Sequence, residues 1–172
     1  MAQRRPGRIE LERFLPYRLS VLTNVVSGSI AETYQRRFGL GIPEWRVIAV
    51  LAMRPGLSAA EVAACTGMDA VAVSRAVGRL LRDRRLVRAT ARDDRRRSVL
   101  RLSAAGKAVY RQVAPLALDY EQELVGCLDP HESAALDSIV QKLTERARAL
   151  AAPVPPHSTG PRRERRPGQA RR

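Results

Sequence analysis

Apolar residues recur at intervals of three and four along most of the chain, a pattern typical of amphipathic helices. A long first helix is predicted from Pro16 to Phe38, with Gly39 as the residue that ends it. Its inner stripe is Leu19, Leu22, Val26, Ile30 and Tyr34. A short second helix is predicted to begin at Pro43 and to end before Pro55 and Gly56.

The third and fourth predicted helices are separated by a tight turn at residues 65–68. Ser58 and Glu61 are spaced as a capping box at the start of the third helix, and Asp69 suits the N-cap of the fourth. The fourth helix combines one apolar stripe with an opposite face of mostly small or basic residues. The stripe is Val73, Val77, Leu80 and Leu81, and the opposite face is Val71, Ser74, Arg75, Gly78 and Arg82.

Two strand-like runs follow, at residues 86–90 and 98–102, and the charged segment 91–97 between them predicts the tip of a hairpin. A fifth helix is expected after Ser103, with a kink at Pro115. Asp129, Pro130 and Glu132 mark the start of a sixth helix. The apolar stripe of this last helix is Leu136, Ile139, Val140, Leu143, Ala147 and Leu150.

These elements predict a mainly α fold with a small β-hairpin wing, in which a winged helix-turn-helix is combined with a helical dimerisation region. We expect a disordered basic N-terminus at 1–10, one domain at 11–152 and a disordered tail rich in Pro and Arg at 153–172. The winged part is expected at 43–103, and the dimerisation helices at 11–38 and 103–152. The apolar stripes of the first and last helices exceed what one small winged domain can cover, which favours a homodimer.

The chain is strongly basic, with 31 Lys and Arg against 17 Asp and Glu in 172 residues, a formal net charge of +14. Residues 153–172 contribute six Arg and one Glu, or +5, so the remainder still carries +9. A balance this basic indicates a polyanionic partner, since each neutralised phosphate releases condensed counterions.

Several other classes of protein are disfavoured by the composition. Two cysteines, Cys65 and Cys127, are too few for a disulfide framework, and the first helix has no cysteine for thiol sensing. His131 and His157 are the only histidines and stand far apart, so we expect no metal site and no cofactor. No nucleophile motif or phosphate-binding loop is present, so an enzyme is not expected. No apolar run approaches membrane-spanning length, and the predicted location is the cytoplasm.

A capped helix, a turn with glycine and a second helix with a basic outer face form a helix-turn-helix, and the hairpin after it makes the motif winged. Small outward residues let such a helix enter the major groove, where Arg can bind guanine or phosphate. The minor groove attracts inserted arginines of the wing. The predicted contacts to double-stranded DNA are Ser58, Ala70, Val71, Ser74, Arg75, Arg79, Asp94, Arg95, Arg96 and Arg97.

Residues 11–150 resemble the MarR family of transcriptional regulators. The resemblance is carried by SAAEVA at 58–63, VSRAVGRL at 73–80, LVR at 86–88, and Asp94 and Arg96 followed by LRLSAAG at 100–106. It implies a homodimer that binds a pseudo-palindromic operator with half-sites one helical turn apart, about 34 Å. It also implies that Asp94 orients Arg96 toward the minor groove.

The resemblance further suggests a repressor that a small aromatic carboxylate releases from DNA. Tyr17, Arg18, Trp45 and Arg46 supply aromatic and cationic groups near the expected junction of the first two helices. The alternative is that Trp45 packs in the core and that the arginines are solvated. For the whole protein, the alternative is a winged-helix module for non-specific nucleic-acid binding or for protein contacts.

Overall fold

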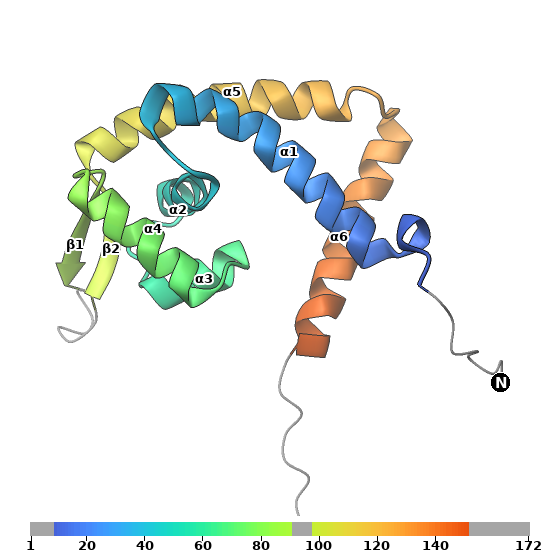
Figure 1. The fold of residues 1–172 in the computed structure, drawn as a ribbon, viewed down its shortest axis with the longest axis horizontal. Helices are drawn as coiled ribbons and strands as arrows, with labels where there is room; N and C mark the ends of the chain where they lie inside the picture. Colours follow the sequence, from blue (N-terminus) through green and yellow to red (C-terminus); the bar gives the residue numbers. More distant parts are fainter. Residues whose placement is uncertain (1–8, 91–97, 152–172) are drawn as a thin grey trace, which may run out of the picture. The chain divides into compact units, whose positions relative to one another are not determined.

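The computed structural model describes residues 9–90 and 98–151, so residues 1–8 of the predicted N-terminal segment, the tip of the wing and the C-terminal tail lie outside the described residues. The elements, in chain order, are η1 (Leu11–Arg13), α1 (Leu15–Phe38), α2 (Ile42–Met53), α3 (Ala59–Thr66), α4 (Ala70–Arg82), β1 (Leu86–Thr90), β2 (Ser98–Leu102), α5 (Ala104–Val125) and α6 (Pro130–Ala151) (Figure 1). The chain forms two compact units, Met1–Leu124 and Val125–Arg172. The mainly α fold with a β-hairpin is confirmed.

The core of the first unit lies among α2, α3, α4 and the hairpin. β1 and β2 are antiparallel, with Leu86 opposite Leu102 and Thr90 opposite Ser98. Leu57 forms an isolated bridge with Leu100, which ties the segment before α3 to the hairpin. The side chains buried in this core include Val47, Ile48, Leu51, Val62, Val73, Ala76, Val77, Leu80, Leu86, Leu100 and Leu102. The apolar stripe predicted on the fourth helix is confirmed at Val73, Val77 and Leu80, with Ala76 added to it, and Leu81 is half-buried against the same core.

Local hydrogen bonds fix where the two helices of the helix-turn-helix begin. The Ser58 hydroxyl accepts from the Glu61 amide at 3.3 Å, and the Glu61 carboxylate accepts from the Ser58 amide at 2.7 Å. Gly67, with φ of 66°, ends α3 in the left-handed conformation that glycine tolerates best. The Asp69 carboxylate then accepts from the amides of Val71 and Ala72, both at 2.9 Å. Both predicted caps are confirmed.

α1 begins one residue before the predicted start and ends at Phe38, with Gly39 at φ of 61°. Its only buried residues are Ala31 and Tyr34, close to its C-terminal end. The N-terminal half contributes nothing to the core, and Leu22 there is 54% exposed. The apolar stripe predicted along the whole helix is therefore buried by the described chain only near one end.

The last two helices, α5 and α6, also leave many of their apolar side chains exposed. α5 buries Gly106, Val109 and Val113 in its first half, and Pro115 lies inside the helix. α6, in the second unit, begins with a capping box between Asp129 and Glu132, as predicted. It has no buried residue. The stripe of α6 is exposed at Leu136, Ile139, Val140, Leu143 and Leu150.

Candidate nucleic-acid interface

α4 presents an exposed face of small residues and one arginine. Ala70, Val71, Ser74 and Arg75 are all exposed, and Val71 reaches 58%. The opposite face, with Val73, Val77 and Leu80, is buried in the core and fixes the rotation of the helix about its axis. The four exposed residues thus share one outward face, as their spacing predicts.

Ser58 lies at the start of the first helix of the helix-turn-helix. Its side chain is half-buried and its hydroxyl oxygen is used in the cap of α3. A hydroxyl that accepts one hydrogen bond still has a proton to donate. The predicted phosphate contact of Ser58 therefore stays a prediction that is compatible with its structural role.

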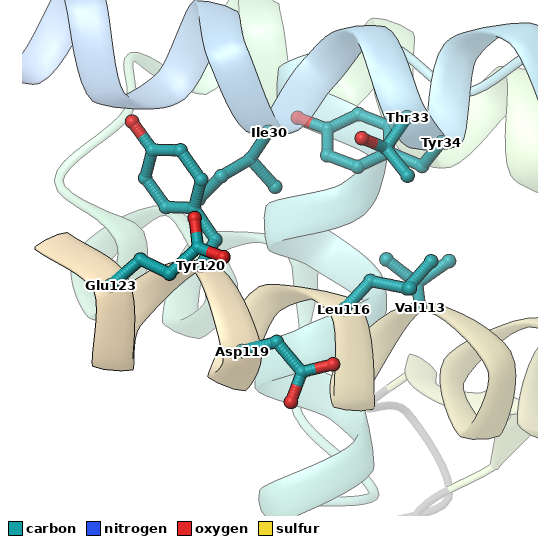
Figure 2. Close-up of a pocket in the computed structure, with 8 residues that line it drawn as sticks. All are labelled: Ile30, Thr33, Tyr34, Val113, Leu116, Asp119, Tyr120 and Glu123. Atoms are coloured by element: carbon teal, nitrogen blue, oxygen red, sulfur yellow. The ribbon is translucent and has the colours of Figure 1, made fainter.

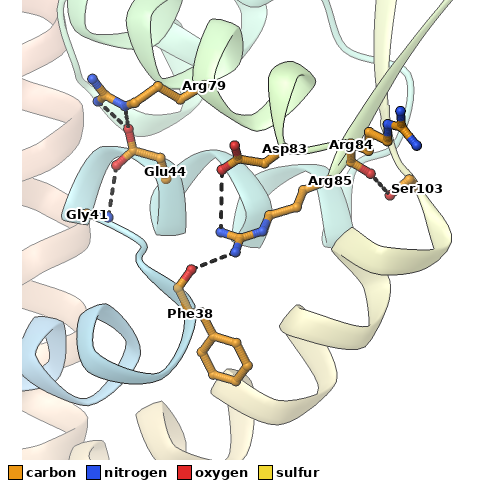
Figure 3. A network of polar contacts seen from close by, with 8 residues as sticks. All are labelled: Phe38, Gly41, Glu44, Arg79, Asp83, Arg84, Arg85 and Ser103. Atoms are coloured by element: carbon orange, nitrogen blue, oxygen red, sulfur yellow. Dashed lines mark hydrogen bonds and ion pairs between the residues drawn. The ribbon is translucent and has the colours of Figure 1, made fainter.

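Arg79 faces the protein rather than projecting freely outward. Its Nε and Nη2 atoms both contact Oε1 of Glu44, a carboxylate in the first turn of α2 that is only 5% exposed (Figure 3). The other carboxylate oxygen of Glu44 accepts from the Gly41 amide at 3.0 Å. The Arg79 side chain is still 48% exposed. Arg79 thus links α4 to α2 through an ion pair, and its predicted DNA contact stays a prediction.

Glu44 was not identified from the sequence as a partner of α4. Glu44 is the third residue of α2, where an acidic side chain usually serves only to cap the helix. Its pairing with Arg79 spans 35 residues and follows from the packing of α2 on α4. The only signal in the sequence is one acidic residue at the start of a helix whose other residues, apart from Arg46, are apolar.

The wing is anchored at its base by polar contacts (Figure 3). Arg85 donates from Nη2 to the Phe38 carbonyl at 2.6 Å, which connects the end of α1 to the start of β1. The Ser103 hydroxyl donates to the Arg84 carbonyl at 2.7 Å. Arg84 has φ of 56°, a left-handed conformation that is uncommon for a residue other than glycine.

Gly106, in the first turn of α5, lies against the backbone of the same segment. A Cβ atom at this position would lie 2.1 Å from the Arg85 carbonyl oxygen, which no side chain tolerates. The glycine therefore permits close approach of α5 to the base of the wing. The predicted contacts at the tip, Asp94, Arg95, Arg96 and Arg97, lie outside the described residues and stay predictions.

The four residues predicted to bind an effector are not brought together within one chain. Trp45 packs between Tyr34 and Tyr110, with ring centroids 5.9 and 6.0 Å away. Arg46 donates to the Ser27 hydroxyl at 3.3 Å. Tyr17 and Arg18 are exposed near the start of α1, and at 1.5 Å per residue Tyr17 lies about 25 Å along the helix from Tyr34. Trp45 therefore packs against the core, as the alternative interpretation of this residue predicts.

A pocket of about 190 Å³ lies between α1 and α5 instead (Figure 2). It is lined by Ile30, Thr33, Tyr34, Val113, Leu116, Asp119, Tyr120 and Glu123. The Tyr120 ring projects from α5 toward α1 (Figure 2). Burial raises the pKa of Tyr34, Arg46 opposes this shift and Glu44 adds to it, so the phenol of Tyr34 stays protonated at neutral pH. None of the four predicted effector residues lines this pocket.

The remaining features of the described part of the chain concern metal sites, membrane-spanning helices and cysteine contacts. Residues 9–90 and 98–151 hold no cluster of three His, Cys, Asp or Glu side chains suited to a metal ion. In the same ranges, no helix is long and apolar enough to cross a membrane. Cys65 is exposed, and Arg54 donates to its sulfur at 3.6 Å.

Comparison with known proteins agrees with this geometry. Residues 38–97 match the model of the MarR family. A MarR/EmrR family transcriptional regulator from Acinetobacter sp. ADP1 is 25% identical, with a TM-score of 0.76 over 82% of this chain and 99% of that one. No curated protein sequence matches significantly.

Two further solved structures are similar in fold. Sco3205, a MarR family transcriptional regulator from Streptomyces coelicolor in complex with DNA, is 23% identical, with a TM-score of 0.69 over 83% of this chain and 92% of that one. BpsR from Bordetella bronchiseptica, described by its regulation of DNA binding by 6-hydroxynicotinic acid, is 21% identical, with a TM-score of 0.69 over 80% of this chain and 98% of that one.

A capped helix-turn-helix followed by an antiparallel hairpin defines the class as winged-helix DNA-binding proteins. Within that class the chain is similar to the MarR family, because the family model matches its helix-turn-helix and the solved structures match its long flanking helices as well.

Proposed function

We propose that the protein is a sequence-specific, homodimeric transcriptional regulator that inserts α4 into the major groove of DNA. The observation that carries this proposal is the outward face of α4, where Ala70, Val71 and Ser74 surround Arg75. Small side chains allow the helix to approach the base edges closely. A guanidinium at this position can then bind guanine with two hydrogen bonds.

The rest of the chain supports the same action. The net charge of +14 favours a polyanion, and the arginines of the wing segment follow a strand that the structure places beside the helix-turn-helix. Sco3205, which shares this fold, has been seen in complex with DNA. No feature of the sequence or of the described residues suggests a reaction, and we infer a binding function without catalysis.

A homodimer is favoured by uncovered apolar side chains on α1 and, separately, on α6. The N-terminal half of α1 exposes Leu15, Leu19, Leu22 and Val25, which lie near one another at helical spacing. Soluble monomers rarely leave apolar surfaces of this extent uncovered. Two copies would present two recognition helices to one pseudo-palindromic site.

We further propose that the protein acts as a repressor whose release from DNA is triggered by a small aromatic acid. The support is the fold shared with BpsR, which is described with 6-hydroxynicotinic acid as regulator of its DNA binding. Such a ligand must bind the form that cannot bind DNA more tightly, and a hundredfold loss of affinity requires about 2.7 kcal/mol of this coupling. The test is a titration of benzoate- and nicotinate-type acids into the protein–DNA complex.

Selection from a random pool of duplex DNA tests the DNA-binding proposal. We expect a pseudo-palindromic consensus with half-sites about 10 base pairs apart. The competing function, non-specific nucleic-acid binding, predicts instead that no consensus emerges after repeated rounds. Recovery of a single half-site would contradict the dimer while retaining specificity.

A further inference from the structure

We propose that Arg85, at the base of the wing, is a positioning residue that fixes the orientation of α4 relative to α1 and α5. The orientation of α4 in each copy decides how far apart two half-sites must lie, so Arg85 sets the half-site spacing that a dimer accepts. This inference rests on the proposed binding of a pseudo-palindromic DNA site. Arg85 is not among the predicted DNA contacts, and its side chain is only 19% exposed.

Two short connections join the winged part of the chain to its long helices. The first connection is residues 39–41, between α1 and α2, and the second is Ser103, between β2 and α5. Leu40 is buried, which holds the first connection in place. Gly39, with φ of 61°, and Gly41 lie on either side of it, and glycine tolerates rotation of the backbone. The first connection alone therefore does not fix the angle between α1 and the winged part.

Arg85 contacts both connections and the end of α4 (Figure 3). Its Nη2 donates to the carbonyl of Phe38, the residue before the first connection, at 2.6 Å. Its backbone carbonyl accepts from the Ser103 amide at 3.0 Å, and its amide donates to the Leu80 carbonyl of α4 at 2.8 Å. Arg85 therefore links α4 to α1 through its side chain and to the start of α5 through its backbone. Only the link to α1 depends on the side chain, so a substitution can remove it alone.

Stability alone does not account for an arginine at this position. Among the described residues, Nη1 of Arg85 has no hydrogen-bond partner although it is buried, and the Asp83 carboxylate lies 4.0 Å from it. A buried donor without an acceptor destabilises a fold. The preceding residue, Arg84, has the uncommon φ of 56°. Two unfavourable features side by side are typical of residues that are kept for a functional reason.

The link between Arg85 and Phe38 has a direct consequence for a dimer on DNA. One added base pair changes the separation of two half-sites by about 3.4 Å and their relative rotation by about 35°. A rigid arrangement favours the one spacing that it matches, because no further ordering is needed when it binds. Without the link, the two copies of α4 can adjust to neighbouring spacings, and the matching spacing loses its advantage.

The full-length Arg85→Met variant tests this inference, because methionine fills a similar space and offers no donor. The DNA probes are the selected duplex, the same duplex with one base pair inserted or deleted between the half-sites, and a duplex with a single half-site. We expect the preference for the selected spacing to fall at least about fivefold from its wild-type value, the lower end of usual couplings between distant parts of a protein. Binding to the single half-site should be unchanged.

Three further variants control for charge, reach and folding. Arg111→Met removes the same charge from the exposed surface of α5 and should keep the wild-type spacing preference. Arg85→Lys should also keep it, because an ammonium can donate to the Phe38 carbonyl. Arg85→Gln, whose side chain is shorter, should lose the preference as Arg85→Met does, and it replaces that variant if methionine prevents folding. The melting temperature of Arg85→Met should change little, because the unpaired donor is lost together with the hydrogen bond.

Hydrogen exchange in the absence of DNA distinguishes a failure of this inference from a failure of the proposed function. Amides of residues 38–42 should exchange faster in Arg85→Met than in the wild type, while exchange in α3 should stay the same. Unchanged exchange at residues 38–42 would overturn the inference, and so would a wild-type spacing preference in Arg85→Met.

Two other results would count against the role of Arg85. Equal weakening on every duplex, the single half-site included, would overturn it, because Arg85 would then bind a phosphate instead of setting the spacing. A wild-type protein with no preferred spacing would contradict the proposed function and, with it, the role in spacing, even where exchange shows that Arg85 fixes the first connection.

Discussion

Arg79 of α4 is paired with Glu44, a buried carboxylate at the start of α2. The two partners differ in exposure, because the Arg79 side chain is 48% exposed and Glu44 is almost fully covered. Removing Arg79 therefore leaves a buried carboxylate without its cation, whereas removing the charge of Glu44 leaves a half-exposed guanidinium without its anion. A half-exposed guanidinium is solvated at little cost, whereas a buried carboxylate without its cation is not.

Arg79→Ala should accordingly destabilise the protein by about 2 kcal/mol, and Glu44→Gln by about 1 kcal/mol or less, after allowance for solvent screening at the arginine. Urea denaturation measures both. The double variant should be no less stable than Arg79→Ala alone, because the glutamine no longer carries an unpaired charge. A larger loss from Glu44→Gln than from Arg79→Ala would contradict this account of the pair.

Arg75→Ala separates recognition from stability. The side chain is exposed and makes no described contact that fixes the fold, so the free energy of unfolding should change by no more than about 0.5 kcal/mol. Binding to the selected DNA should weaken by about 1–3 kcal/mol, with relaxed preference at one base in each half-site. Arg36→Ala, which removes an exposed arginine paired with Glu32, is the matched control and should bind as wild type. If the Arg75→Ala variant gives the same footprint and affinity as the wild type, Arg75 does not contact the bases and the prediction is contradicted.

Gly106→Ala tests the anchoring of the wing. The new methyl group would collide with the Arg85 carbonyl, and we expect a loss of about 2–4 kcal/mol in thermal or urea unfolding, by displacement of α5 from the wing. Gly78→Ala is the control, because a Cβ at this position of α4 meets no atom within 4 Å. It should stabilise the protein by about 0.5–1 kcal/mol through helix propensity. Equal effects of the two substitutions would be incompatible with the described packing.

Much of this architecture was predictable because the signals are local. The caps at Ser58 and Asp69, the end of α1 at Gly39 and the hairpin register each depend on residues within one turn or one strand pair. The Glu44–Arg79 pair was not predictable, because it depends on how two helices pack across 35 residues. The stacking of Trp45 on Tyr110 likewise joins two residues that are 65 positions apart.

The four residues predicted to bind an effector do not gather within one chain, for a related reason. Tyr17 and Arg18 lie at the start of α1, whereas α2, which carries Trp45, follows the C-terminal end of α1. The rise of α1 instead carries Tyr17 and Arg18 far from Trp45, which meets the opposite end of that helix at Tyr34. The length of α1 therefore decides that Trp45 contacts Tyr34 and not Tyr17 within one chain.

The dimer is tested by charged substitutions on the exposed apolar residues of α1. Leu19→Glu with Leu22→Glu should convert a dimer to a monomer in light-scattering measurements, because two carboxylates cannot be buried in an apolar interface without partners. Neither residue is buried within the chain, so the secondary structure should remain. A wild-type protein that is monomeric at micromolar concentration would contradict the dimer itself.

The central claim is that the protein recognises a DNA sequence, and the ratio of two affinities tests it most directly. The full-length protein should be titrated, at physiological salt, with the duplex that selection recovers and with a scrambled duplex of the same composition. We predict a preference of about 10³ or more for the selected duplex. A ratio near one, with both affinities falling equally as salt is raised, would show that the basic chain binds phosphates alone and would contradict the account.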